Sequence, residues 1–529
     1  MQYNSWFYLF VFLLGTVFLY YVMPLKARWG VLLVASIVFY VLSSRYLIFY
    51  VVASAFCIYF AGLWIEHCNI RLKEKRKELS KEEKKAAKQK NKKKTRRILI
   101  LAILVNFGIL FVTKYFNFFG ENMNLLFGGT DKNGIIPHLD ILMPLGISFY
   151  TLSAVSYVTD IYWGKCSAQK NPLKLLLFLC FFPAITEGPI SRYPQLGPQL
   201  YEGHRFDYDR FCFGAQLIIW GLVKKVVMAD PLNNVVKHVF AEPGNYHSGT
   251  VIVTILLYTF QIYMDFSGCI DITRGSAQLF GVELEENFKQ PFFATSVNDF
   301  WRRWHMTLGG WLRDYVFYPL SMSKLCQTIS KKCRKVMSGY YAATIPGIFA
   351  LLGVWIGNGV WHGAEWKYIV YGMYYYVIMV IGMLLEPLFL KAIDKMGVKR
   401  EKGGYHLWQI FRTFVLINIG MTIFRAKDLK AAGDMLVSCF TQWESGIGLM
   451  NLLRDCKYNL GRVIILFFFV AALVVIGIWK EKGIRIRQSI AEKPIILRWA
   501  IYAGAILFVI SFGAYGPGYG AVDFMYAQF

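Results

Sequence analysis

Apolar runs of about 20 residues recur along this chain and limit what it can fold into. A run of that length crosses the roughly 30 Å hydrocarbon core of a bilayer as a helix, which satisfies its own backbone hydrogen bonds in lipid. Apolar residues make up 56% of the 529-residue chain, against roughly 45–50% in soluble domains. The sequence therefore predicts one all-α, polytopic membrane domain over 1–529, a helical bundle with about 11 to 13 apolar segments.

The apolar runs are separated by polar segments and show no internal repeat. Two of them, 30–43 and 173–186, are short for a full crossing, so we expect them to be tilted, re-entrant or packed inside the bundle. The first run lacks a basic leader and a cleavage site, which favours a retained helix over a signal peptide. The runs lie at 5–23, 30–43, 46–66, 98–117, 139–160, 173–186, 211–229, 249–268, 343–361, 366–390, 407–424, 463–479 and 496–515.

The net charge of +25 is concentrated in polar segments, above all in 71–97, which holds 15 Lys/Arg against 4 Glu. Basic residues gather on the cytoplasmic side of membrane proteins, so a nucleic-acid partner is not needed to explain this charge. We expect 71–97 to be a basic cytoplasmic loop or surface helix; contact with anionic lipid or a cytosolic partner is the alternative. Counting crossings from this segment, and from the basic stretch 480–498, places both termini outside the cytoplasm.

A second inference concerns the stretch "GNGVWHGAEW" at 357–366. The segments 324–335 and 391–402 on either side are basic, and both are expected in the cytoplasm. The two apolar runs between them must then form a hairpin, out and back, with His362 at its turn. Irregular backbone at membrane depth is tolerated where it is buried in protein or lines a watery cavity, so His362 is a candidate functional residue.

The second candidate histidine is His305, in "NDFWRRWHMTLGGWLRDYVFYPL" at 298–320. On a continuous helix Trp301, Trp304 and His305 would share one face. The stretch could anchor the protein at the membrane interface, but its density of charge beside one histidine favours the lining of a polar channel. Arg313 and Asp314 are expected to form a buried charge pair.

Three acidic residues interrupt other apolar stretches and are costly in lipid unless paired. Asp265 and Asp271 lie in "YMDFSGCIDITRG", where Arg274 is a possible partner for Asp271. Glu187 lies between two prolines, which break helices and leave free carbonyls.

The residue types present also limit which reactions the protein could catalyse. Ten scattered cysteines show neither paired nor metal-ligand spacing, so no metal site is expected. There is no Gly-x-Ser-x-Gly elbow and no P-loop, which leaves serine hydrolysis and ATP-driven work unsupported. A neutral imidazole is a suitable general base for a hydroxyl. A base without a protein nucleophile fits direct acyl transfer from a thioester to a hydroxyl.

At these residues the chain resembles the membrane-bound O-acyltransferase (MBOAT) family, in its bacterial branch of alginate O-acetylation and teichoic acid D-alanyl transfer proteins. The resemblance implies a helical bundle around a transmembrane tunnel, with the acyl donor arriving from the cytoplasm and the acceptor from outside. It makes His362 the catalytic residue, with His305 in the same tunnel. The matching motifs are "PLGISFYTLSAVSYVTDIY" (144–162), "FFPAITEGPISRY" (181–193), "DFSGCIDITRG" (265–275), "ENFKQPF" (286–292), "FWRRWHMTLGGWLRDYVFYPL" (300–320) and "GVWHGAEW" (359–366).

The expected site combines these observations. Its catalytic residues are His362 and His305. The residues expected to line the tunnel or contact substrate are Trp304, Trp361, Asn358, Asp265, Ser267, Arg313, Asp314 and Glu187.

The favoured function is transfer of an acyl group, here acetyl, from a cytoplasmic thioester to an exported polysaccharide in a bacterial cell membrane. No bound cofactor is expected; acetyl-CoA or a charged acyl carrier is the donor substrate. The expected partners are the lipid bilayer, the polysaccharide, an extracytoplasmic acetyltransferase-like protein and a cytoplasmic acyl carrier. D-alanyl transfer to teichoic acid is the second hypothesis, and a lipid or protein acceptor the third. A transporter of an anionic or acyl-bearing substrate is the alternative outside enzymes.

Overall fold

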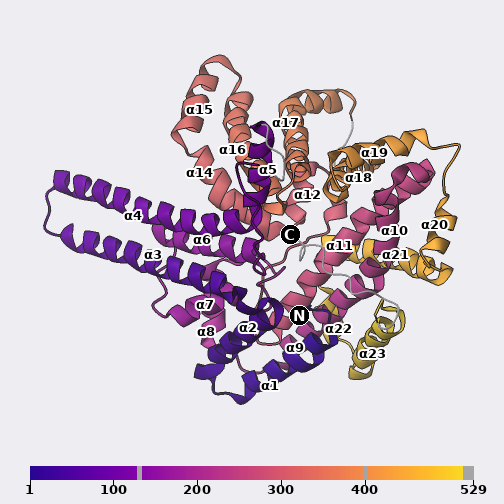
Figure 1. Ribbon diagram of the computed structural model, residues 1–529, viewed down its shortest axis with the longest axis horizontal. Coiled ribbons are helices and arrows are strands. Elements are labelled where there is room, and N and C mark those ends of the chain that lie inside the picture. Colours follow the sequence, from indigo (N-terminus) through magenta and orange to yellow (C-terminus); the bar gives the residue numbers. More distant parts are fainter. Residues whose placement is uncertain (128–133, 398–402, 516–529) are drawn as a thin grey trace. The chain divides into compact units, whose positions relative to one another are not determined.

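Helices make up almost all the regular structure of residues 1–127, 134–397 and 403–515, which the computed structural model describes (Figure 1). Within those residues the only strand-like pairings are two isolated β-bridges. The described part contains nine helical segments long and apolar enough to cross a membrane, and a shorter apolar helix at Phe7–Val22. The predicted all-α, multi-pass membrane fold is confirmed. The nine segments are Leu25–Lys75, Lys81–Leu126, Tyr208–Ala241, Ser248–Gln278, Gly339–His362, Trp366–Lys395, Gly404–Arg425, Leu460–Glu481 and Ile495–Phe512.

Internal contacts divide the chain into two compact units, Met1–Ile218 with Asp271–Glu285, and Ile219–Ile270 with Glu286–Phe529. The helices of the first unit are η1 (Phe7–Leu13), α1 (Leu14–Val22), η2 (Leu25–Ala27), α2 (Arg28–Ser44), η3 (Arg45–Leu47), α3 (Ile48–Lys75), α4 (Lys81–Leu110), η4 (Phe111–Tyr115), α5 (Phe116–Leu126), α6 (Ile147–Trp163), α7 (Pro172–Cys180), α8 (Tyr193–Glu202) and most of α9 (Tyr208–Leu222).

The second unit begins at the end of α9 and contains both candidate histidines. The helix α11 (Ser248–Gln278) passes from this unit into the first. The other helices are η5 (Val223–Ala229), α10 (Asp230–Ala241), η6 (Pro243–Asn245), η7 (Pro291–Phe293), α12 (Val297–Arg303), α13 (Met306–Leu312), η8 (Arg313–Phe317), α14 (Tyr318–Ser321), α15 (Lys324–Val336), α16 (Gly339–His362), α17 (Trp366–Lys395), α18 (Gly404–Arg425), α19 (Leu429–Thr441), α20 (Leu449–Asp455), α21 (Leu460–Glu481), α22 (Ile486–Ala491) and α23 (Ile495–Phe512).

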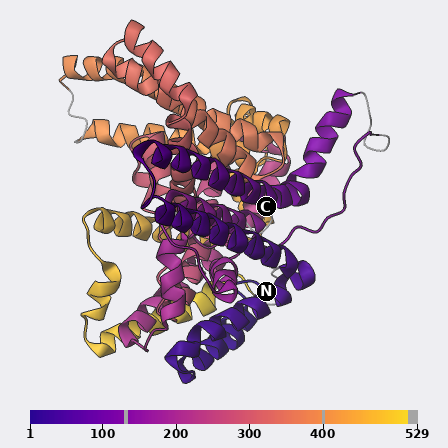
Figure 2. The ribbon, with the colours of Figure 1, turned by 90° about the vertical axis from the view of Figure 1, so that its left-hand side faces the viewer.

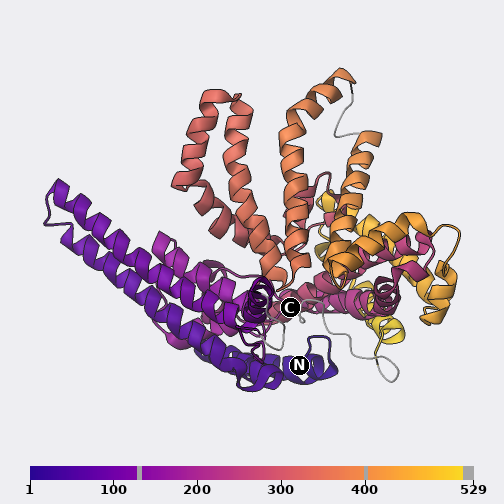
Figure 3. The ribbon, with the colours of Figure 1, turned by 45° about the horizontal axis from the view of Figure 1, so that its top comes forward.

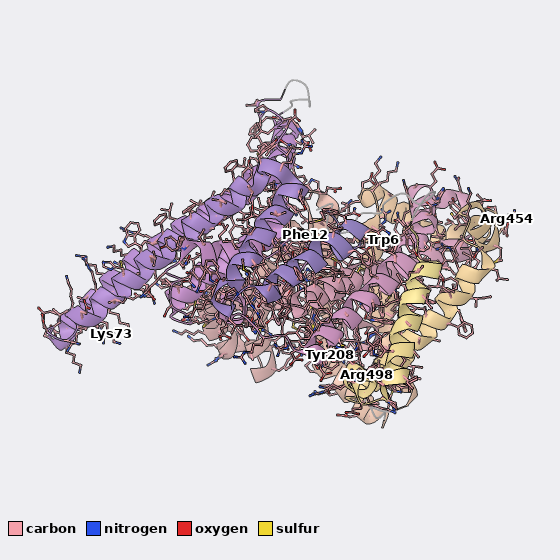
Figure 4. The ribbon with its side chains drawn as sticks, turned by 90° about the horizontal axis from the view of Figure 1, so that it is seen from below. Trp6, Phe12, Lys73, Tyr208, Arg454 and Arg498 are labelled. Atoms are coloured by element: carbon pink, nitrogen blue, oxygen red, sulfur yellow. The ribbon has the colours of Figure 1, made fainter. Side chains whose placement is uncertain are left out.

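The basic segment 71–97 is largely helical rather than a loop. It contains the end of α3 and the start of α4, which run side by side as a hairpin with Lys73 near its far end (Figures 1 and 4). Ser80 begins α4 through a reciprocal capping box with Glu83, which satisfies two backbone donors of the first turn. The Asn91 amide donates to the Asn69 oxygen at 2.9 Å, across the two arms. Of the two predicted alternatives, a loop or a surface helix, the structure therefore shows a surface helix. The location of this segment in the cytoplasm stays a prediction.

The apolar run at 139–160 is only partly helical. The chain from Gly134 to Leu145 contains no helix and follows α5 as an extended segment (Figure 2). Asn117 and Asn124 each use both ends of their amide to bind the backbone of one residue in it, Leu139 and Ile136, at 2.9 Å. After this segment α6 is buried along nearly its whole length, so it is an internal helix of the first unit.

The hairpin predicted between 324–335 and 391–402 is present as α16 and α17, which lie closest near the turn and diverge toward their other ends (Figure 3). Two glycines allow the close approach. A Cβ on Gly372 would lie 2.5 Å from the Trp355 carbonyl oxygen, and one on Gly359 would lie 2.5 Å from that of Tyr368. The turn carries His362, as predicted. The basic residues at 398–402 lie outside the described residues.

We expect Gly372→Ala to destabilise the protein, because the added methyl group can only be accommodated if α16 and α17 move apart. Overpacking of this kind costs about 1–3 kcal/mol. The matched control is Gly382→Ala in the same helix, where a Cβ meets nothing within 4 Å, and where alanine is the better helix former. The midpoint of thermal unfolding in detergent should fall for Gly372→Ala alone. Equal midpoints for the two variants would show that the hairpin is not closely packed at this point.

Candidate active site

His362 is the last residue of α16 and is buried. Its ring contacts Trp361 from its own helix, Tyr371 from α17 and Phe424 from α18, at centroid distances of 4.9, 5.8 and 5.1 Å. Asn358 lies one helical turn earlier on α16, where residues four apart share a face, and is also buried. The α16–α17 turn therefore places an imidazole inside an aromatic cluster of the second unit.

The stretch around His305 is not the continuous helix that the sequence analysis assumed. The helix α12 ends at Arg303, Trp304 is extended, and His305 has φ 47° and ψ 50° before α13 begins. This left-handed conformation is uncommon for a residue with a side chain. It is held by backbone bonds from Lys289 N–H to Arg303 O at 2.9 Å and from Met306 N–H to Asn287 O at 3.0 Å. The predicted shared face of Trp301, Trp304 and His305 is therefore wrong.

The break places the His305 ring among groups from three different elements. Its Nδ1 lies 3.4 Å from the Asn287 oxygen, and its ring lies 4.8 Å from Phe266 on α11 and 5.4 Å from Trp361 on α16. Trp361 therefore contacts both histidine rings. Burial holds the pKa of the His305 imidazole well below its usual range, because a charged form would lose its hydration. His305 is consequently neutral near pH 7.

The other expected site residues are distributed unevenly. Trp304 is almost fully buried, and its ring stacks with Phe300 at 5.4 Å. Asp265 and Ser267 flank Phe266 on α11 and are buried. Glu187 is buried in the first unit, in the non-helical segment that follows α7.

The Arg313–Asp314 pair is not buried as expected. Arg313 Nε lies 3.1 Å from Asp314 Oδ1, but the two side chains are 61% and 26% exposed. The prediction of a buried charge pair is wrong, because the π-helical turn η8 presents both residues near the surface of the unit. The local pair of Asp271 with Arg274 is confirmed, with an N–O distance of 3.9 Å.

Lys224, Lys225 and Asp230 form a buried charge cluster that was not predicted from the sequence. Lys225 Nζ lies 2.6 Å from Asp265 and 2.9 Å from Asp230, with its side chain fully buried. Lys224 Nζ donates to Ser267 Oγ at 3.0 Å. The sequence does show two adjacent lysines in the apolar run 211–229. A charged side chain is costly in lipid unless it is paired, and this reasoning, applied above to Asp265, would have identified both lysines as well.

No group of three or more His, Cys, Asp or Glu side chains in the described ranges could hold a metal ion. The chemistry open to this site is that of the His362 imidazole beside the neutral imidazole of His305, in a buried aromatic environment. Such a group can take a proton from a substrate hydroxyl.

We expect Lys225→Met to lower stability strongly, since it leaves two carboxylates buried without their cation. Removing one partner of a buried ion pair costs about 3–5 kcal/mol. Arg313→Gln is the control, because exposed pairs contribute only about 0–1 kcal/mol. Folded yield and thermal midpoint should fall for Lys225→Met and stay near wild type for Arg313→Gln. A stable Lys225→Met protein would contradict the role given to this ion pair.

The fold and this site define a multi-pass membrane protein with two buried histidines near each other. Residues 167–331 match the sequence model of the membrane-bound O-acyltransferase family, MBOAT; the match includes His305 and ends before His362. Over 444 residues the chain is 31% identical to the probable alginate O-acetylase AlgI of Pseudomonas syringae pv. tomato, covering 83% of this chain and 75% of that protein.

Two further relatives carry other names. The peptidoglycan O-acetyltransferase of Helicobacter pylori is 29% identical over 391 residues, 69% of this chain and 68% of that protein. The teichoic acid D-alanyltransferase of Bacillus subtilis is 31% identical over 249 residues, 46% of this chain and 59% of that protein. The chain belongs to the membrane-bound O-acyltransferase family. It is a multi-pass membrane O-acyltransferase similar to alginate O-acetylases.

Proposed function

We propose that this O-acyltransferase moves an acetyl group from a cytoplasmic thioester donor, through the membrane, to hydroxyls of an exported polysaccharide in a bacterial cell. The observation that carries the proposal is the pair of buried imidazoles, His362 and His305, in contact with the same Trp361 ring. The transfer is direct or uses an extracytoplasmic acetyltransferase-like partner. Both termini are extracytoplasmic in this scheme.

His362 acts as the general base in the proposed reaction. Its imidazole takes the proton of the acceptor hydroxyl, the oxygen attacks the thioester carbonyl, and an ester bond forms as the carbon–sulfur bond breaks. The proton then leaves with the thiol of the donor. No protein nucleophile is required, in keeping with the lack of a serine elbow in the sequence.

The helices α15 and α16 indicate the membrane face at which the acyl donor would bind. The helix α16 has 24 residues, which at about 1.5 Å each span roughly 36 Å, more than the hydrocarbon core. His362 ends this helix, whereas α15, with five exposed basic side chains, precedes its start. Basic groups pair well with phosphate or acidic protein surfaces. This end of α16 fits the anionic part of acetyl-CoA or a charged acyl carrier.

The choice of acetyl over D-alanyl transfer rests on the extent of the similarity. The alignment with the alginate O-acetylase covers most of this chain, and that with the D-alanyltransferase covers less than half. A polysaccharide is therefore the favoured acceptor. Teichoic acid remains the second candidate.

We expect His362→Ala to lower acyl transfer by about 10²–10⁴-fold, since that is the usual contribution of a positioned general base. Protein accumulation in the membrane should be unchanged. His67→Ala, on the exposed surface of α3, is the control and should transfer at the wild-type rate. Base-labile ester on the acceptor is the quantity to measure, and normal ester content with His362→Ala would remove this residue from the mechanism.

Sealed vesicles test the route of transfer. With oriented protein, acetyl-CoA or a charged carrier supplied only to the face bearing 324–335 should acylate acceptor on the opposite face. The passage admits the acyl-bearing thioester end of the donor and not its bulky remainder, so donor supplied to the other face should give no product. Transfer that needs donor and acceptor on one face would refute the route across the membrane, even with His362 essential.

A further inference from the structure

The buried side chain of Asn287 lies directly beside His305. Its Oδ1 receives hydrogen bonds at 2.9 Å from both the backbone N–H and the hydroxyl of Thr307, and it lies 3.4 Å from His305 Nδ1. Asn287 is only 1% exposed, so one amide oxygen serves three groups away from water.

These contacts identify the atoms involved. A backbone N–H can only donate, so the Asn287 atom facing Thr307 N–H is the amide oxygen and not the amide nitrogen. An amide oxygen can only accept, so a hydrogen bond across the 3.4 Å contact requires the proton on His305 Nδ1. A neutral imidazole has one ring proton, which leaves the other nitrogen, Nε2, with its lone pair.

We propose that Asn287 is a positioning residue of the transferase, holding His305 in the neutral tautomer protonated on Nδ1 so that Nε2 can accept a hydrogen bond from a substrate hydroxyl. The inference rests on the proposed function, which supplies that hydroxyl. Through Trp361, His305 adjoins His362. One imidazole removes the proton of the attacking hydroxyl, and the other orients an acceptor hydroxyl that does not react. Polyols such as sugars supply such a second hydroxyl.

Asn287 also has a structural role, which the experiment must separate from positioning. Its oxygen receives the Thr307 N–H in the first turn of α13, a donor that the helix itself leaves unsatisfied. A fall in activity after mutation of Asn287 would therefore be ambiguous. The tautomer of His305 and the pH dependence of transfer report on positioning alone.

The first measurement is the nitrogen-15 NMR spectrum of the full-length wild-type protein in lipid. Only two of the eight histidines, His305 and His362, follow a tryptophan, so carbonyl-labelled tryptophan with labelled histidine selects them. Signals through Met306 and Gly363 distinguish the two. We expect protonated Nδ1 and unprotonated Nε2 for His305 between pH 6 and 8. Protonated Nε2 would overturn the proposal without any variant, and without reference to transferase activity.

The second measurement compares pH–rate profiles of Asn287→Asp and Thr307→Val. A carboxylate at position 287 still accepts all three bonds but favours the imidazolium, so it raises the pKa of His305. The protonated ring has no lone pair, and the acid limb of the profile should move up by about one unit or more. Thr307→Val removes one bond to the same oxygen and should leave the limb at its wild-type pH.

The outcomes of this comparison are distinct. Coincident profiles for wild type and Asn287→Asp would overturn the positioning role. An equal shift with Thr307→Val would assign the effect to folding of α13 and overturn it as well. If wild type itself transfers no acyl group to polysaccharide, the proposed function fails, whereas the NMR result still decides the tautomer. If Asn287→Asp does not fold, the wild-type spectrum remains the deciding measurement.

Discussion

The ion pair of Lys225 with Asp265 and Asp230 is the interaction on which the candidate site depends. A lysine taken fully out of water is stable only when carboxylates replace its hydration, and here two of them lie within 3 Å. One of these carboxylates, Asp265, is adjacent to Phe266, whose ring contacts His305. Lys224 holds Ser267 on the other side of that phenylalanine. The charge cluster therefore fixes the part of α11 against which the histidine packs.

The two histidines reach the same aromatic cluster by different means. His362 ends a long helix whose partner approaches closely enough to exclude any side chain at Gly372. His305 occupies a break between two short helices, in a left-handed conformation maintained by pairing with 287–289. Backbone strain of this kind persists only where surrounding bonds determine it.

Sequence patterns predicted the membrane helices, the hairpin and the position of His362 at its turn, because hydropathy and basic flanks report directly on lipid crossing. The position of His305 relative to Trp304 could not be predicted, since it depends on pairing with 287–289, which helical periodicity does not contain. The exposure of Arg313 was missed for a similar reason: charge in an aromatic stretch suggests burial but does not determine it. Lys225 was visible in the sequence, and only its partners required the structure.

The capped hairpin of α3 and α4 has a practical consequence for imaging. Its two arms carry the chain beyond the apolar parts of both helices and are joined by the short turn before Ser80. A folded marker protein inserted at this turn, with its own two terminal helices continuing α3 and α4, would be connected at both ends. Such a marker would stand clear of the detergent micelle, giving particles of a 61.0 kDa membrane protein a feature by which to align them in electron cryomicroscopy.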